Sequence, residues 1–321
     1  MRKKRILSGI LIVVIMVISV MISCVYAEEK VDLKLRLEKG QSYKTKTTQD
    51  MKINQTVPGQ VVTITQKTEM RNMYTVEDVQ ADSTLVLKVT YDAILSKIWI
   101  PDPNQNIEYD SSDTSVSSDN PIASIFGAIA GQSLIITITS DGHVKEIKGA
   151  DALWERIQEK INELSEGGPE RAGMETQMKM QYSEEALKTN TENSFNMYPD
   201  NPIGIGDTWQ RKTTMNQGFP MVIDAIYTLK ERKNGIAVID VFAMIQTNRD
   251  VGPIEMGPDK IQYNMSGSVT GIMEIQESTG WIKHSNQNMR LTGSIIVQSP
   301  EIQQPISMPI SVTGTINVEP Y

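Results

Sequence analysis

The chain has 321 residues, with 31 Lys and Arg against 39 Asp and Glu, which gives a formal net charge of −8. Its one Cys excludes an internal disulfide framework and a Cys-based zinc cluster, and its two His leave little for a His-rich metal site. An acidic chain whose one block of basic residues lies at 2–5 also lacks the clustered cations that nucleic-acid binding needs.

Residues 1–27 have the order of a secretory signal peptide. The basic residues at 2–5 precede an apolar run over 6–22 that contains no charge, and small side chains then lead to Glu28. This order predicts export across a membrane and cleavage before Glu28.

Two alternatives to a cleaved signal remain open. Residues 21–24 resemble the lipobox of bacterial lipoproteins, in which Cys24 would become the lipidated first residue. The apolar run is also almost long enough to remain as a membrane anchor. We expect an extracytoplasmic protein, secreted or attached to a bacterial-type cell envelope. Because residues 1–27 carry four cations and no anions, their removal would lower the net charge from −8 to −12.

Strand patterns dominate the first part of the mature chain. Apolar and charged residues alternate over 31–37, as in a half-buried strand. Two long strands over 42–57 and 60–76 follow, joined by a Pro-Gly turn. A further strand over 83–100 changes the parity of its apolar residues near Ala93. This change indicates a β-bulge, which would bend the strand and curve its sheet.

The middle of the chain is mainly helical. We expect a polar loop over 101–120, and a hairpin over 133–149 that turns at an Asp-Gly pair. Apolar residues spaced three and four apart predict three helices, over 121–130, 151–165 and 174–194.

Strands return in the last third of the chain. They are predicted over 207–216, 220–232, 235–248, 260–276, 281–298 and 305–318. Most are sequential neighbours, so the sheet should be antiparallel. Several exceed the usual length of about five or six residues. The sequence therefore predicts a mainly β (α+β) fold, a curved sheet or incomplete barrel of about a dozen strands with two or three helices packed on it.

The domain organisation has two interpretations. They are a single mainly-β domain over 28–321, or two related halves, 28–149 and 200–321, joined by a helical segment 150–199. The second rests on a weak repeat, because residues 40–48 resemble residues 206–214 with four of nine positions identical. Coincidence between two amphipathic strands would explain the same similarity.

No catalytic motif stands out. The sequence contains no Gly-x-Ser-x-Gly nucleophile motif, and the chain would have no Cys after cleavage before Glu28. Residues 102–113 place oxygen ligands at alternate positions but lack the glycine and terminal Glu of a calcium loop. Met174, Met178 and Met180 offer soft ligands, although packing on one helix face explains two of them. We therefore expect a non-catalytic protein with no cofactor and no metal site.

The apolar helix over 121–130 is the candidate for a ligand-facing element. Its apolar side chains are Ile122, Ile125, Phe126 and Ile129. Trp154 of the next predicted helix is the fifth candidate for a ligand-facing or lid residue. The helix could cap the end of a β-core, act as a lid over an apolar cavity, or touch a membrane. Because it contains no Lys or Arg, membrane contact is the least favoured of the three.

Short motifs along the chain carry a resemblance. They are Leu37-Glu38-Lys39-Gly40 followed by Tyr43, then Tyr109-Asp110-Ser111, then Asp141-Gly142-x-Val144-x-x-Ile147-x-Gly149, and finally Pro202-x-x-x-Gly206-Asp207-Thr208-Trp209. In this order they resemble an uncharacterised family of secreted bacterial envelope proteins, a domain of unknown function. The architecture also looks similar to the half-barrel of lipoprotein carriers, in which a curved sheet holds acyl chains under a helical lid. The family brings no catalytic residues with it.

The leading functional hypothesis is an exported, non-catalytic envelope protein that binds an apolar or amphipathic, lipid-like ligand in the concave face of the sheet. The alternative is a protein-interaction or structural envelope module whose core is filled by its own side chains. The expected partners are a lipid or other apolar ligand, or an envelope protein. Nucleic acid is not expected, and contact with a membrane would come only through the signal or a lipid anchor.

Overall fold

The computed structural model describes residues 30–57, 59–101, 106–113, 121–164, 167–216, 220–256, 258–300 and 304–321. The signal segment, Cys24 and part of the candidate calcium loop lie outside these ranges.

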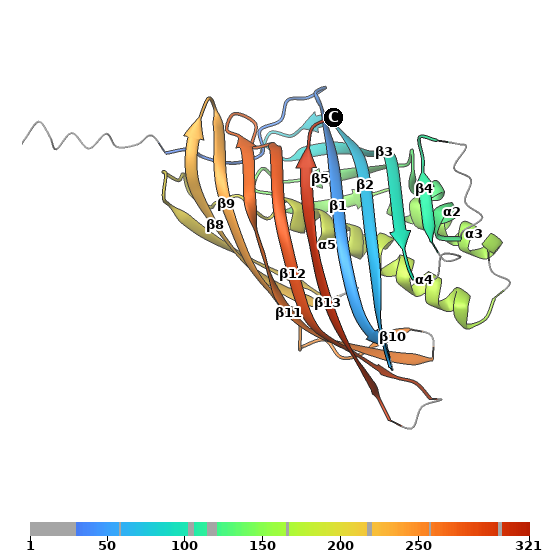
Figure 1. Cartoon of the computed structure of the whole chain (residues 1–321). Coiled ribbons are helices and arrows are strands. Elements are labelled where there is room, and N and C mark those ends of the chain that lie inside the picture. The colour runs from blue at the N-terminus through green and yellow to red at the C-terminus, as the bar shows by residue number, and fades with distance from the viewer. Residues whose placement is uncertain are drawn as a thin grey trace, which may run out of the picture.

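The described residues form one antiparallel sheet of thirteen strands, and the sheet is open (Figure 1). The strands are β1 (Ser42–Val57), β2 (Gln60–Val79), β3 (Leu85–Trp99), β4 (Ile107–Asp110), β5 (Ser133–Ile138), β6 (Val144–Lys148), β7 (Thr208–Met215), β8 (Met221–Lys233), β9 (Ile236–Thr247), β10 (Ile254–Met256), β11 (Asp259–Gln276), β12 (Ile282–Gln298) and β13 (Ile306–Glu319). Their order is β6-β5-β3-β2-β1-β13-β12-β11-β9-β8-β7, with β4 beside β3 and β10 beside β11. The predicted fold class is confirmed.

Helices lie on one face of this sheet (Figure 1). Those in the described ranges are α2 (Pro121–Ile129), α3 (Ala150–Leu164), α4 (Pro169–Tyr182) and α5 (Glu184–Phe195). None of them is long and apolar enough to cross a membrane.

The single helix predicted over 174–194 is wrong. Ser183 has an extended backbone, and its side chain caps α5 by accepting a hydrogen bond from the Ala186 amide at 3.3 Å.

Two short strands, β4 and β10, were not predicted from the sequence. Each has only three or four residues and pairs with one long neighbour. The loop predicted over 101–120 is therefore wrong at Ile107–Asp110. In that segment Ile107 is buried and lies opposite Ile98 of β3. Pairing with β3 therefore forms a strand that is too short to show an alternating pattern in the sequence.

The parity change near Ala93 is a β-bulge, as predicted. Asn72 of β2 lies opposite Tyr91, and the preceding Arg71 lies opposite Ala93, which leaves Asp92 without a partner on β2. The extra residue moves the buried set from Tyr91 to Ile94, so β3 bends while both parts keep apolar side chains on one face.

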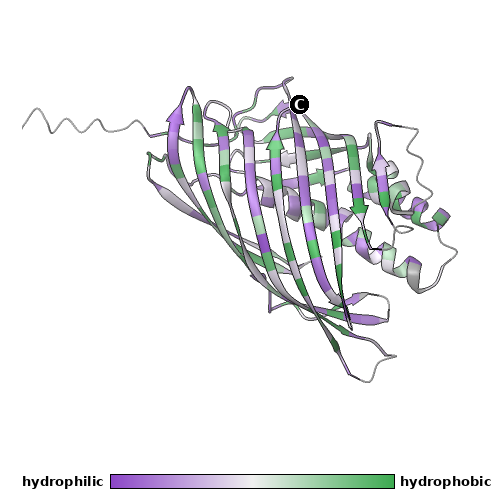
Figure 2. Ribbon diagram, in the orientation of Figure 1, coloured by the Kyte–Doolittle hydropathy of each residue, from purple (hydrophilic) through white to green (hydrophobic). Residues whose placement is uncertain are grey.

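The sheet has an inner face, toward the helices, and an outer face. Hydrophilic and hydrophobic residues alternate along the long strands, as expected when only one face is covered (Figure 2). On the inner face of β11, a side chain added to Gly267 would fall onto the carbonyl of Arg290 in β12. The neighbouring backbones therefore approach too closely on this face for any residue but glycine.

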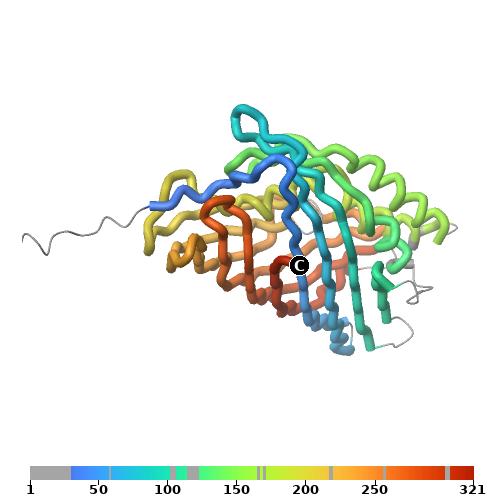
Figure 3. Tube along the Cα trace, turned by 90° about the horizontal axis from the view of Figure 1, so that it is seen from above, coloured from blue at the N-terminus to red at the C-terminus, as the bar shows by residue number. Residues whose placement is uncertain are grey.

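The N-terminal segment 31–37 is not the strand that its alternation predicted. Val31 makes an isolated bridge with Ile203, while the amides of Leu35 and Arg36 donate to the Ser140 and Thr279 carbonyls. Its apolar side chains are nevertheless buried. The segment runs along the upper end of the sheet, where it ties the β5–β6 turn to the β11–β12 turn (Figure 3).

The two segments of the weak repeat begin their hairpins in the same way. The Gly40 amide donates to the Val76 carbonyl at 2.8 Å, and the Gly206 amide donates to the Leu229 carbonyl at the same distance. Both glycines have positive φ, of 84° and 88°. In each hairpin the return strand also bulges directly after the residue that accepts this bond. The local backbone geometry of the two segments is thus the same.

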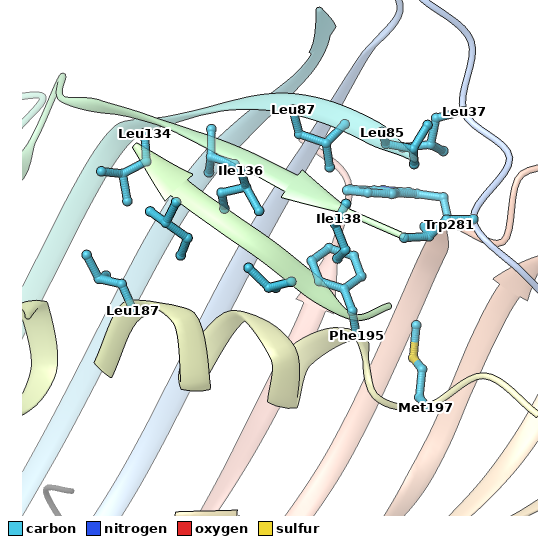
Figure 4. Packing of buried hydrophobic residues seen from close by; sticks show 14 of the residues in the cluster. Leu37, Leu85, Leu87, Leu134, Ile136, Ile138, Leu187, Phe195, Met197 and Trp281 are labelled. Carbon is cyan, nitrogen blue, oxygen red and sulfur yellow. The ribbon is translucent and has the colours of Figure 1, made fainter. Parts of the chain in front are cut away.

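The main core lies between the helices and the strands around β3, β5 and β6. Leu85, Leu134 and Ile138 from these strands face Leu187 and Phe195 of α5 (Figure 4). All five are buried, so this part of the inner face is filled by the protein's own side chains.

We predict opposite effects for alanine at two glycines. Gly267→Ala should lower the free energy of unfolding by about 1–3 kcal/mol, because its Cβ would overlap the β12 backbone. Gly173→Ala, in α4 with open space around it, should raise it by up to about 1 kcal/mol. Urea denaturation of both variants measures this. Equal shifts would contradict the close approach of β11 and β12.

We also predict a loss of stability at alkaline pH. Burial raises the pKa of Tyr182 to about 12 and raises the pKa of Tyr198 further. Above about pH 10 these phenols ionise only in the unfolded chain, so each lowers the free energy of unfolding by up to about 1.4 kcal/mol per pH unit. Phenolate absorbance and far-ultraviolet circular dichroism should therefore change together for these two residues. Ionisation of both in a chain that keeps its native spectrum would show that they are not buried.

Candidate functional site

A cavity of about 490 Å³ lies between the inner face of the sheet and the end of α5. Its floor comes from β8, β9 and β11, with Ala225 and Ala243 directly opposite each other. These two small side chains are flanked by larger ones, including Ile223 and Ile245. The floor is thus depressed where two alanines meet.

Aromatic side chains lie at the upper end of the cavity. The rings of Tyr74 and Trp281, which both line it, have centroids 5.1 Å apart at an interplanar angle of 69°. Phe195 lies 6.2 Å from Trp281, and Figure 4 shows it reaching from the end of α5 toward this ring. The Tyr74 phenol is neutral near pH 7, and burial raises its pKa further. The upper end is therefore aromatic and uncharged.

Hydrogen bonds hold the segment after α5 against the sheet. The Trp209 indole donates to the Met197 carbonyl at 2.7 Å, and the Tyr198 hydroxyl donates to the Gly280 carbonyl at 2.9 Å. Trp209 also stacks on Tyr227 of the lining, with centroids 5.4 Å apart. These contacts fix the position of Met197, which lines the cavity from above.

One side of the cavity is polar. Inward side chains of β1 and β12, on either side of β13, supply Thr47, Gln49, Ser285 and Gln287. The Gln287 amide donates to the Ser285 hydroxyl at 3.2 Å. The lining therefore combines a largely apolar floor with a polar row, an arrangement that suits a ligand with an apolar body and a polar end.

The candidate residues chosen from sequence lie elsewhere. Ile125 and Ile129 of α2 are buried in the main core, while Phe126 and Trp154 pack against it partly buried. The Ile122 side chain and Cys24 lie outside what the structure describes. None of the described four lines the cavity. Their position is that of a core cap, and a ligand-facing role for them remains a prediction.

Sequence reasoning missed the residues that do line the cavity. The alternation of β8 and β9 identifies their inward sides, and Ala225 and Ala243 are the small members of those sides. That they lie opposite each other depends on the register of two strands, which hydropathy does not reveal.

A second, larger hollow of about 750 Å³ lies on the outer face. Its lining includes Asp50, Lys52 and Arg290 with several Thr, Ser and Asn side chains. Hydrated charged groups of this kind do not retain an apolar molecule. The inner cavity is therefore the better candidate for a binding site.

Comparison with known proteins gives a family and distant structural likenesses. No curated protein matches the chain. Among solved structures, lipovitellin is 11% identical with a TM-score of 0.46 over 89% of this chain, which spans only a quarter of that protein's length. An outer membrane channel of Pseudomonas putida F1 is 8% identical over 89% of this chain and 97% of its own, with a TM-score of 0.24. Neither likeness is close enough to carry an argument about function.

A family profile matches residues 82–282, from the turn before β3 to the first residue of β12. The match covers more than half of the chain, including the helices and much of the cavity floor. The chain therefore belongs to a family of unknown function, DUF6263.

Proposed function

We propose that this protein binds an apolar or amphipathic, lipid-like ligand in the cavity on the inner face of its sheet, without catalysing a reaction. The observation that carries the proposal is the cavity itself. Its volume of about 490 Å³ falls within the range of about 300–1,000 Å³ typical of small-molecule sites.

The contrast with the main core supports a ligand rather than a purely structural interior. Around Leu85 and Leu134 the space between sheet and helices is filled by side chains, as protein interiors normally are. Next to Val241 and Met273 the same inner face leaves an apolar space. An apolar chain bound there would gain dispersion contacts with the side chains that line this space.

The alternative, a protein-interaction or structural module, draws on a different observation. On the outer face Ile226, Phe242, Met244 and Ile272 are more than one-third exposed on adjacent strands. Such a patch would suit contact with another protein. Native mass spectrometry of detergent-free protein separates the two: a lipid-sized excess mass supports the ligand, and an apo mass together with no uptake of fluorescent fatty alcohols contradicts it.

A bulky residue on the cavity floor should block binding. Ala243→Trp would fill the depression opposite Ala225, so we expect at least a tenfold loss of affinity for a fluorescent fatty alcohol. Met244→Trp is the matched control, because the next residue of β9 lies on the outer face and is 51% exposed. Fluorescence titration measures both, and equal affinities for the two variants would place the ligand elsewhere.

We further propose that the protein acts outside the cytoplasm after cleavage before Glu28. Val31 is already bonded to Ile203, which leaves few residues after Cys24 for a lipoprotein tether. We therefore expect cells that express the protein to incorporate no radioactive palmitate into it. Palmitate labelling that disappears in Cys24→Ala would instead assign the lipoprotein route.

A further inference from the structure

From the lining of the cavity, and resting on the proposed function, we infer that the ligand is an electrically neutral amphiphile. Its apolar chain lies over β8, β9 and β11, and its uncharged head, a hydroxyl, ester or amide, meets the polar row of β1 and β12. A free fatty acid or another anionic lipid is not the preferred ligand.

Among the described residues that surround the cavity there is no Asp, Glu, Lys, Arg or His. An ionised carboxylate taken from water into this space would lose its hydration without gaining a cationic partner. An uncharged head avoids that penalty.

A cation beside the cavity floor is already engaged. Arg211 of β7 lies opposite the lining residue Ala225 of β8. Its guanidinium, however, donates to the Asp200 carboxylate at 2.7 Å and also to the Tyr198 carbonyl. An anionic head would have to compete with both of these acceptors for Arg211.

The carboxyl end of α5 lies at the cavity. The last three residues of this helix, Asn193 to Phe195, line the cavity, and its last turn contains no basic residue. The carboxyl end of a helix carries partial negative charge. This end repels an anion but attracts a hydroxyl or amide donor.

The polar side chains of β1 and β12 lie on either side of β13. Thr47 and Ser285 both lie opposite Val318, and Gln49 and Gln287 both lie opposite Ile316. The members of each pair are therefore two strand spacings apart, about 10 Å. Side-chain hydroxyls and amides both donate and accept hydrogen bonds, so a neutral polar head that lies over Val318 and Ile316 can bond to the side chains of either strand.

The test compares two ligands of the same chain length, monolauroylglycerol and laurate, near pH 8, where the carboxylate is ionised. Binding to the purified protein is followed by tryptophan fluorescence, to which Trp281 in the lining contributes. We expect monolauroylglycerol to bind at least about tenfold more tightly. Equal or tighter binding of laurate would overturn the inference while leaving the proposed function intact. If neither ligand binds, the proposed function fails, and the inference fails with it.

The variant Gln287→Arg tests whether the head of the ligand binds at the polar row. A cation there should reverse the preference and favour laurate, because it supplies the missing partner for the carboxylate. Asn288→Arg is the matched control, since the next residue of β12 lies on the outer face and should leave the preference unchanged. An equal shift in both variants would show that bulk charge, not the row, decides selectivity and would overturn the placement of the head. The ratio measured on the unaltered protein tests the inference even if Gln287→Arg does not fold.

Discussion

The rest of the structure depends on one constraint: the helices and the segment 31–37 must cover the apolar inner face of the sheet, and they are shorter than its long strands. β11, with 18 residues, buries apolar residues on one side of its pleat and exposes residues on the other. Apolar side chains left uncovered along that length would cost free energy in proportion to their area. The helices and the segment 31–37 cover the part around β3, β5 and β6. Where α5 ends, the sheet continues, and the cavity lies at this boundary.

The extended segment 31–37 and the end of α5 each approach a turn glycine closely. A side chain at Gly280 would fall onto the carbonyl of Lys34, and one at Gly142 would fall onto the carbonyl of Phe195. Gly280 lies in the turn between β11 and β12, and Gly142 lies in the turn between β5 and β6. The contact at Gly142 positions Phe195, which lines the aromatic upper end of the cavity.

Several features of the fold could be predicted because their signals are local. The hairpins follow from turn dipeptides, and the bulge at Asp92 follows from a change of parity within one strand. The segment 31–37 has an equally clean alternation, but its amides bond to loops instead of a neighbouring strand. Alternating burial therefore occurs both in β-strands and in an extended segment that packs on the end of the core without joining a sheet. Only the partners of the backbone distinguish them.

The sequence by itself determined the composition of the inner face and the mainly β class, because apolar and polar residues alternate along each strand and this alternation can be read from one segment alone. Its one Cys and two His also exclude Cys-based zinc clusters and His-rich metal sites. Only the tertiary structure decided where the inner face borders a cavity. Ala225 and Ala243 are ordinary small residues until the register of β8 and β9 sets them opposite each other beneath the end of α5. Register and packing join residues far apart in the chain, and hydropathy along one strand contains no information about its neighbours.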